Sequence, residues 1–526
     1  MMLCEVQVKL QEFRKILHNN GNLMQILVGY NNVDLSQLYG THTQAQFNQM
    51  KSWFDDMITF SRELLSEVRN IIENFVDFQR DRPVHIPSFS EFEEVCVDFY
   101  QCLMDLCKQF TDVQNNQLAW IMFALSGYSD DRLPMWSMWW NEIQRIMVIL
   151  IQCSLIYESQ PPSIIRKDRI FSAKLRWLVG SKLDVNMIKN IRGTIQIVNE
   201  NVVNNLRRGA NQQTSGFLPI TQRAEPYFEI GEHGEVTMEL SKNILSMISR
   251  NPSRNVDKKI DEKYALLFRT DILWNNETVE ICAISLPICL TTHMLQDEYS
   301  NGRIMWDYAF SRGNDQEPRV PEVVTWQELA PVLSRTWKSS IGCHLTEYHL
   351  RYLYDKLFDK HPDSQELPSL TISWIQFARN HMPGTDFTFW SWFYNAMRLI
   401  KKYFAEHWRE NYVIGFIHKN NARMWLENQQ PAGTFLFRFS ESLLGRMSID
   451  VILEEKDYNL RVSSCGPFSD FNNKTLNQFI GDFETLTTLY PGIPLNQAFP
   501  RESACKTPNP THYRPVNTKH TVANDE

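Results

Sequence analysis

The sequence GTFLFRFSES, residues 433–442, sets one arginine inside a segment that otherwise predicts a buried β-strand. Alternate side chains of a strand point to opposite faces, so the three phenylalanines share one face, while Leu436, Arg438 and Ser440 share the other. A buried guanidinium is costly unless an anion pairs with it, and its planar fork fits a carboxylate or a phosphate. The strand position alone favours an internal ion pair with an aspartate or glutamate.

The residues that follow Arg438 favour a phosphate ligand instead. Ser440 and Ser442 supply hydroxyl groups at the expected end of the strand. A phosphate pocket needs an arginine, hydroxyls and free backbone N–H groups together, and a strand-to-loop junction provides the N–H groups. The segment therefore predicts an anion site beside Arg438.

Composition limits the possible classes of protein. The chain has 526 residues, of which 43% are hydrophobic and 12% aromatic, as expected of a globular protein with two to four domains. Its formal net charge of -8 argues against a nucleic-acid coat but allows a local basic face. The amino end has no apolar signal core, and the longest apolar run, 146–157, is too short to span a membrane. We expect a soluble cytoplasmic and nuclear protein.

No motif for catalysis or metal binding stands out. The ten cysteines are scattered from Cys4 to Cys505 without a C-x-x-C pair or a zinc-type histidine spacing, which favours reduced thiols over a disulfide framework. No G-x-S-x-G and no glycine-rich phosphate loop with lysine is present. We therefore expect no enzyme, no metal, no cofactor and no small-molecule substrate.

The amino-terminal segment predicts a bundle of long helices. Between Phe47 and Phe78 apolar residues recur at steps of three and four, with Ser61 as the one polar break. Ser88 and Glu91 form a capping box that starts a third helix, and Pro134 opens a fourth. The pattern predicts helix throughout, to about Ser159, with buried seams.

The segment after Pro161-Pro162 predicts an all-β region. Short apolar runs alternate with polar loops there, at residues 170–179, 234–240, 265–270 and 279–290. Basic residues gather in two loops that either face solvent or contact phosphates. These residues are Arg166, Lys167, Arg169, Lys174 and Arg176 in the first group, and Arg250, Arg254, Lys258 and Lys259 in the second.

From about Pro321 helices return and lead into the region around Arg438 without a Gly/Ser linker, so we expect these two parts to pack rigidly. The stretches that carry a family resemblance are IDEKYALLF (260–268), ISLPICLTTH (284–293), ISWIQFARNHMPG (372–384), FTFWSWFYNAMRLIKKYF (387–404), WRENYVIGFIHK (408–419), AGTFLFRFSES (432–442) and LYPGIP (489–494). Through them the chain resembles the signal transducer and activator of transcription (STAT) family over nearly its whole length.

The resemblance implies a multidomain fold. It implies an all-α four-helix coiled-coil domain at 1–159, used for protein contacts, and an immunoglobulin-like β DNA-binding domain at 160–318. An α-helical connector at 319–403, an α+β SH2 domain at 404–500 and a flexible phosphotyrosine tail at 501–526 would follow. The separate amino-terminal domain of many relatives and a long activation domain are expected to be missing.

The resemblance also implies roles for residues near Arg438. Arg438 would hold the phosphate with two hydrogen bonds, Ser440 and Ser442 would donate hydroxyls, Glu441 would lie in the same loop, and Lys419 would add a second cation. Beyond Tyr490 the only tyrosine is Tyr513. It is either the phosphorylated residue or a solvated tail residue, because Arg514 and Pro515 follow it where relatives generally have an aliphatic residue.

In the β domain the resemblance places His293 at the DNA groove, with Gln296 three residues later. A histidine can donate or accept toward a base edge, although a lone histidine at a strand end is more often structural. Arg166 and Lys167 would contact DNA phosphates, which set register without reading sequence.

Two functions follow from these expectations. The first is a transcription factor: a tyrosine kinase phosphorylates Tyr513, Arg438 of each subunit holds the partner's tail, and the homodimer binds a palindromic site on double-stranded DNA. The alternative is a scaffold that reads phosphotyrosine on other proteins and binds DNA little or not at all.

Overall fold

The computed structural model describes residues 2–29, 41–79, 89–115, 132–207, 217–221, 226–245, 262–311, 320–359, 370–428, 430–454, 460–469 and 474–500. The chain divides into two compact units. Unit 1 contains Met1–Ser339 and Leu367–Arg379, and unit 2 contains Ser340–Glu366 and Asn380–Glu526. Among the described residues, no helix has both the length and the apolar character needed to cross a membrane.

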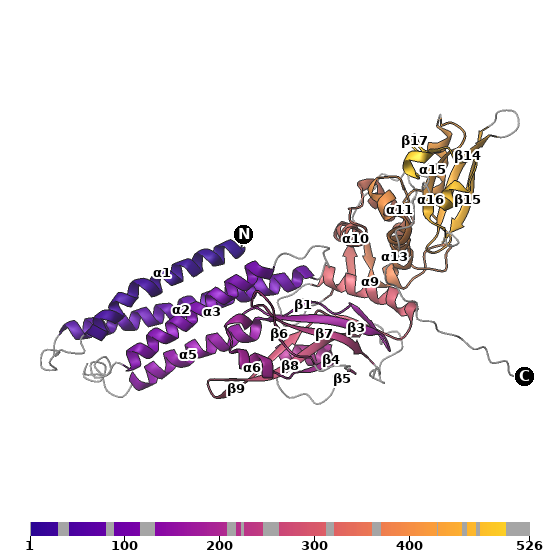
Figure 1. Ribbon diagram of the computed structural model, residues 1–526. Coiled ribbons are helices and arrows are strands. Elements are labelled where there is room, and N and C mark those ends of the chain that lie inside the picture. Colours follow the sequence, from indigo (N-terminus) through magenta and orange to yellow (C-terminus); the bar gives the residue numbers. More distant parts are fainter. Residues whose placement is uncertain are drawn as a thin grey trace, which may run out of the picture. The chain divides into compact units, whose positions relative to one another are not determined.

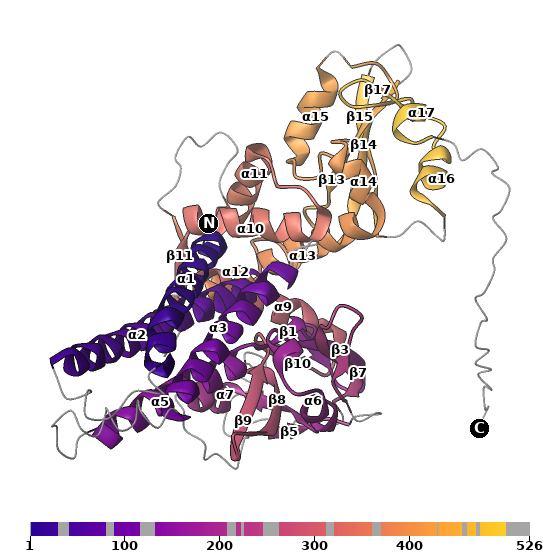
Figure 2. The ribbon, with the colours of Figure 1, turned by 60° about the vertical axis from the view of Figure 1, so that its left-hand side comes forward.

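Long helices open unit 1 and lie side by side (Figures 1 and 2). They are α1 (Met2–Gly29), α2 (Thr41–Phe78), α3 (Phe89–Asn115) and α5 (Arg132–Cys153). The predicted seam of α2 is buried, including Met50, Phe54, Met57, Leu64, Val68, Ile71 and Phe75. Ser61 is buried too, and its Oγ donates to the Met57 carbonyl oxygen at 2.7 Å, so the polar break satisfies itself within the helix. The predicted capping residue Ser88 lies outside the described residues.

The β region of unit 1 is a sandwich of two sheets. One has the strand order β1-β3-β7-β6, and the other has the order β2-β10-β8-β4-β5 with β9 paired to β8. The strands are β1 (Leu155–Ser159), β2 (Ile164–Arg166), β3 (Ile170–Trp177), β4 (Thr194–Asn199), β5 (Phe217–Pro219), β6 (Glu229–Ile230), β7 (Val236–Ile244), β8 (Lys263–Trp274), β9 (Glu277–Ile284) and β10 (Ile288–Thr291). Period-2 burial of β3 turns Phe171, Ala173, Leu175 and Trp177 into the core, as its sequence predicts.

Two details of the predicted organisation are wrong. Helix does not continue to Ser159, because α5 ends at Cys153 and Ser154 alone joins it to β1. Ser154 is buried, its N–H donates to the Leu150 carbonyl, and its own carbonyl accepts from Leu178 N–H, so a strand can begin at once. The run 279–290 forms two strands, β9 and β10. The β region also contains short helices: η4 (Gly180–Lys182), α6 (Val185–Asn190) and α7 (Glu200–Arg207).

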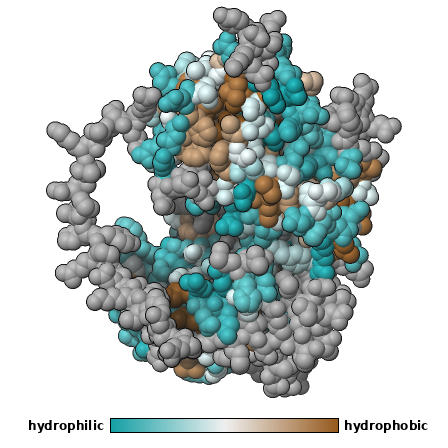
Figure 3. Space-filling model, turned by 90° about the vertical axis from the view of Figure 1, so that its right-hand side faces the viewer, coloured by the Kyte–Doolittle hydropathy of each residue, from teal (hydrophilic) through white to brown (hydrophobic). Residues whose placement is uncertain are grey.

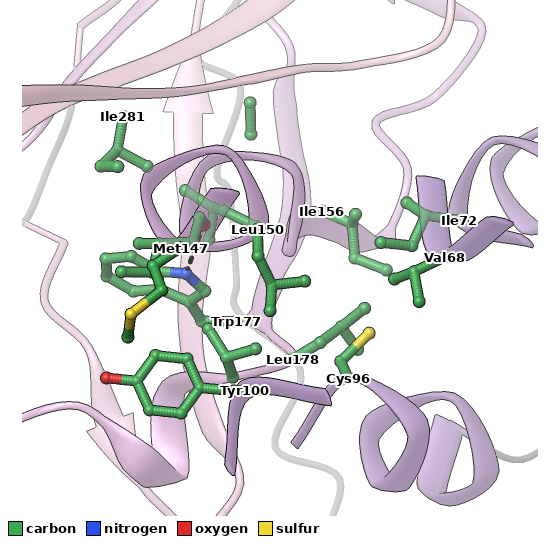
Figure 4. Packing of buried hydrophobic residues seen from close by; sticks show 14 of the residues in the cluster. Val68, Ile72, Cys96, Tyr100, Met147, Leu150, Ile156, Trp177, Leu178 and Ile281 are labelled. Carbon is green, nitrogen blue, oxygen red and sulfur yellow. Dashed lines mark hydrogen bonds between the residues drawn. The ribbon is translucent and has the colours of Figure 1, made fainter. Parts of the chain in front are cut away.

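The helices and the sandwich share one hydrophobic core. Figure 4 shows Trp177 of β3 beside Met147 and Leu150 of α5, with Tyr100 of α3 nearby. Trp177 is fully buried, and its indole Nε1 donates to the Ile151 carbonyl at 3.0 Å. Burying a large aromatic side chain of this kind contributes strongly to stability. The bundle and the sandwich are therefore packed together within unit 1.

A helix follows the sandwich in unit 1. α9 (Met294–Phe310) brings Trp306 against Trp374 of α12 (Trp374–Ala378), with ring centroids 5.5 Å apart. The remaining elements here are β11 (Val323–Thr325), which pairs with β12 (Thr371–Ser373), and α10 (Trp326–Ile341), whose last two residues belong to unit 2.

Unit 2 is a five-stranded sheet with helices packed against it, in the order β15-β14-β13-β16-β17. Its strands are β13 (Thr434–Phe439), β14 (Met447–Glu454), β15 (Leu460–Phe468), β16 (Thr488–Leu489) and β17 (Ile493–Pro494). Its helices are α11 (Glu347–Phe358), α13 (Phe389–Leu399), the π-helix η5 (Ile400–Phe404), α14 (Ala405–Arg409), α15 (Lys419–Glu427), α16 (Leu476–Gly481) and α17 (Leu495–Ala498). The predicted fold class, a helical bundle, β domain, helical connector and α+β domain, is confirmed.

Candidate functional site

Arg438 lies on β13 and is buried, with 7% of its side chain exposed. The phenylalanines of β13 occupy the opposite face, where Phe437 packs on Phe404 and Phe499 at centroid distances of 5.4 and 5.8 Å. The Arg438 face also carries Leu436, which packs with Leu426 of α15. The alternation that the sequence predicts thus holds across the strand.

An internal carboxylate pairs with Arg438. The guanidinium Nε donates to Oδ2 of Asp450 on β14 at 2.5 Å, and 2% of the Asp450 side chain is exposed. Ser464 of β15 donates its hydroxyl to Oδ1 of the same carboxylate at 2.6 Å. The ion pair that the strand position alone favoured is therefore present, and all three polar residues lie on neighbouring strands of one sheet.

The loop from Ser440 to Arg446 closes the β13–β14 hairpin. Ser440 N–H donates to the Arg446 carbonyl at 2.9 Å, and Ser440 Oγ accepts from Leu443 N–H at 3.1 Å. Among the described residues, the N–H groups of Glu441 and Ser442 make no hydrogen bond, and the Ser442 side chain is exposed. The loop offers a phosphate two N–H donors and one free hydroxyl beside Arg438.

Apolar side chains also lie on this loop. Leu443 is 43% and Leu444 38% exposed. Figure 3 shows a largely hydrophilic face of the molecule on which apolar residues gather in small groups.

Glu441 joins the loop to two helices. Its Oε1 accepts from the Tyr352 hydroxyl at 3.4 Å and lies 3.5 Å from His418 Nδ1. The Lys356 ammonium donates to the Glu441 backbone carbonyl at 3.4 Å. From α13, Trp392 donates its indole N–H to the Ser440 carbonyl at 3.0 Å. Two helices of the predicted connector, α11 and α13, therefore contact the candidate phosphate loop directly.

Burial and charge act in opposite directions on Glu441. Burial raises the pKa of Glu441, but the hydrogen bond from His418 and the charges of Lys356, His418 and Arg438 outweigh burial, so the net pKa is below its ordinary value. Burial lowers the pKa of Lys356, and the nearby Glu441 opposes that shift. Burial, followed by Glu441, raises the pKa of Tyr352 well above its ordinary value. Glu441 is thus held ionised beside the loop.

Lys419 is the first residue of α15, directly after His418, and its side chain is exposed. Its neighbour His418 contacts Glu441 of the loop. Arg438, Ser440, Glu441 and Ser442 lie at the end of β13 and in the loop that follows it, whereas Lys419 lies on α15 of the same unit. Tyr513 lies outside the described residues.

The four predicted DNA-contacting residues gather where β2 and β10 end. Arg166 pairs with Thr291 in the parallel register of these strands, and Lys167 N–H donates to the Thr291 carbonyl at 2.8 Å. His293 is exposed at the start of α9, and its side chain makes no capping hydrogen bond. Gln296 follows one turn later.

Two of these residues are engaged internally. Arg166 forms an ion pair with Asp297, which also accepts from the Thr291 hydroxyl at 2.7 Å. Gln296 Oε1 accepts from Thr292 N–H at 2.9 Å. His293 and Lys167 remain exposed at this edge, although Lys167 lies 3.8 Å from Asp168. The edge therefore presents a histidine and a lysine to a ligand more freely than it presents Arg166.

Part of the predicted basic loop faces inward. Arg176 binds Glu158 and Glu93 at 2.8 Å each, and Lys174 lies 3.3 Å from Glu158. Both cations are on β3, and their ion pairs with carboxylates of β1 and α3 connect these elements of unit 1. These two side chains are therefore already paired and are not free to bind phosphate. The second basic group, Arg250 to Lys259, lies outside the described residues.

Sequence reasoning missed Asp450, Ser464, His418 and Lys356. A signal for Asp450 was present, because Ser448 and Asp450 interrupt the apolar run of β14 at a spacing of two and so share a face. No local pattern marks Lys356, which comes from a distant helix, α11.

Comparison with known proteins gives consistent matches. Residues 159–291 match the model "STAT protein, DNA binding domain", 314–393 match "Signal transducer and activator of transcription, linker domain", and 412–489 match "SH2 domain". A "Signal transducer and transcription activator" from Anopheles gambiae is 29% identical over 391 residues, which cover 71% of this chain and 52% of that protein. The chain thus spans about half the length of this relative. With the fold and the loop around Arg438, these matches identify the chain as a member of the STAT family.

Proposed function

We propose that the protein is a signal-dependent transcription factor whose dimer forms when Arg438 of each subunit holds the phosphorylated Tyr513 of the other. A tyrosine kinase would supply the phosphate, and the dimer would bind a palindromic site on double-stranded DNA in the nucleus after its release from the cytoplasm. The β domain at 160–318 would bind the DNA, the SH2 domain at 404–500 would bind phosphotyrosine, and the tail at 501–526 would carry it. The bundle at 1–159 would contact other proteins, and the connector at 319–403 would join the β domain to the SH2 domain.

One observation carries the proposal: a buried arginine lies at the base of a loop with free N–H groups and an exposed hydroxyl. A phosphotyrosine phosphate has a charge near -2 at neutral pH, and an arginine fork is its best geometric match. Ser440 and Ser442 follow Arg438 in the same loop, and Lys419 would add a second cation from the start of α15. From Phe499, 14 residues lead to Tyr513, enough to reach about 45 Å when extended.

Light scattering of the kinase-treated chain tests the reciprocal contact. We expect phosphorylation to double the molar mass, because a two-fold dimer forms both phosphate contacts together. Tyr513→Phe and Arg438→Ala should each remain monomeric, and free O-phosphotyrosine should compete. A phosphorylated wild-type chain that stays monomeric, or an Arg438→Ala variant that dimerises equally well, would rule the mechanism out.

A second candidate is a phosphotyrosine-reading scaffold with little DNA binding. The ion pair between Arg166 and Asp297 favours it, because a neutralised arginine attracts DNA phosphates less. Binding of the phosphorylated chain to a palindromic duplex, measured by fluorescence anisotropy at several salt concentrations, separates the candidates. For the transcription factor we expect affinity to fall steeply with salt and His293→Ala to reduce sequence preference. A flat salt response would favour the scaffold.

A further inference from the structure

Asp450 already accepts a hydrogen bond from the guanidinium of Arg438, which is the group that binds phosphate in the proposed function. The side chains of Arg438 and Asp450 are 7% and 2% exposed, so water and salt hardly screen their contact. We infer that Asp450 is a built-in competitor of phosphate, which neutralises Arg438 in the empty site and lowers the affinity of the site for phosphotyrosine. The inference rests on the proposed function, since it concerns the same pocket.

The geometry leaves an approach for phosphate but keeps the carboxylate close. Asp450 binds Nε, Nη1 points at the Phe439 carbonyl at 3.5 Å, and Nη2 makes no hydrogen bond among the described residues. A phosphate on the Nη side would therefore meet Asp450 across the width of one guanidinium. Like charges at that separation in a buried site repel strongly, and the attraction of Arg438 is shared between two anions.

Asp450 is held in place from its other side. Ser464 donates to Oδ1, and Ser464 pairs directly with Asp450 in the register of β14 and β15. A rotation of the carboxylate away from Arg438 would break this hydrogen bond inside the sheet. The competitor is therefore fixed by the fold and does not leave when phosphate arrives.

Asp450 is the carboxylate that binds Arg438 directly among the described residues. Glu441 is the other acid of the pocket, but its contacts go to Tyr352, His418 and Lys356. Substitution of Asp450 thus removes one negative charge from Arg438 without disturbing the network that supports the loop.

A purely positioning role for Asp450 predicts the opposite effect. If the carboxylate only aimed the guanidinium, its loss would loosen Arg438 and weaken phosphate binding. If it competes, its loss leaves an unpaired buried cation, which destabilises the free protein and which a bound phosphate compensates. The sign of the affinity change decides between the two roles.

The experiment is calorimetric titration of the full chain with O-phospho-L-tyrosine and with phenyl phosphate. We expect Asp450→Asn and Asp450→Ser to lower Kd at least about tenfold, within the usual range of coupling between sites. Two different side chains remove the same charge, so the comparison does not depend on one of them packing well. Asp482→Asn is the matched control, because its ion pair with Lys474 lies on the surface of unit 2 and should not affect binding.

The arginine background completes the test. In Arg438→Ala, binding should be lost, and adding Asp450→Asn should not restore it. Equal or weaker binding by both Asp450 variants, with binding still dependent on Arg438, would overturn the competitor while leaving phosphotyrosine recognition intact. Failure of every form to bind either ligand would overturn the proposed pocket together with the inference.

Discussion

His349 shows how burial sets the charge of a single residue in unit 2. Its Nδ1 accepts from Thr346 N–H at 3.3 Å in the capping box of α11, and its ring lies 5.0 Å from the ring of Trp408. Burial lowers the pKa of His349 to about 4, against a hydrogen bond with the Ile414 backbone that raises it. The residue is therefore neutral in the folded protein at neutral pH.

The shift makes unit 2 sensitive to acid. Between the ordinary pKa of 6.5 and about 4, the unfolded chain binds a proton at His349 that the folded chain does not, so stability falls as pH falls through this window. The loss amounts to up to about 3 kcal/mol. We expect His349→Gln, which keeps an acceptor for the cap, to lose less stability than wild type between pH 7 and pH 4.5. Urea unfolding followed by hydrogen exchange of residues 340–358 measures this difference, and parallel losses in the two proteins would contradict it.

At the same scale, the sequence revealed the site only in part. Arg438 could be found because an arginine in an apolar alternating segment is conspicuous, and the loop residues follow it directly. The alternation of β14 marks Asp450 as a polar residue on one face of that strand, but the sequence does not show that it pairs with Arg438, because the pairing depends on the register across the β13–β14 hairpin. Lys356 reaches the loop through tertiary packing, which leaves no local signal.

Among the elements, β13 depends on a glycine outside it. Gly415 N–H donates to the Phe437 carbonyl at 2.9 Å, and its carbonyl accepts from Phe439 N–H at 2.8 Å. Its φ is +65°, and a Cβ there would lie 2.6 Å from the Trp408 ring and 2.8 Å from the Phe439 ring. The backbone conformation and the close approach both require glycine at this position.

Gly415→Ala should therefore destabilise unit 2 more than a glycine substitution in open space. Gly384 is the matched control, because its φ is +70° but no atom lies within 4 Å of its would-be Cβ. We expect a loss of about 1 kcal/mol for Gly384→Ala, and about 2–4 kcal/mol for Gly415→Ala, where overpacking adds to the strain. Thermal unfolding of unit 2 compares the two variants. Equal losses of stability would show that the rings of Trp408 and Phe439 move aside without cost.

Element type was easiest to predict where periodicity is long. The buried steps of α2 run from Met50 to Phe75, about seven turns, so its seam is plain in the sequence. By contrast, α9 was missed inside the expected β region. Gly302 and Asn301 weaken its helix propensity, and burial of Ile304 and Trp306 stabilises it instead. Tertiary packing decided the outcome there.

On the scale of the whole molecule, each unit has its own hydrophobic core. The large cluster that joins bundle and sandwich lies in unit 1, and a separate cluster around Leu436, Leu426 and Ile452 lies in unit 2. The candidate DNA edge belongs to the first unit, and the candidate phosphate pocket belongs to the second.

We expect calorimetry of the full chain to resolve at least two unfolding transitions. O-phosphotyrosine at 100 times its Kd should stabilise the transition of unit 2 by about 2.7 kcal/mol and leave that of unit 1 unchanged. Hydrogen exchange at increasing temperature assigns each transition to its residues. A single transition that shifts as a whole with ligand would show that the units unfold cooperatively.

The junction at Ser154 has a mechanical consequence for unit 1. The helix α5 passes into β1 through this one buried residue, and Arg176 ties β3 to acids on β1 and α3. The bundle and the sandwich therefore rotate together as one rigid body, because no flexible segment lies between α5 and β1. A protein that binds the outer surface of the bundle would reorient the edge that carries His293 by the same angle as the bundle.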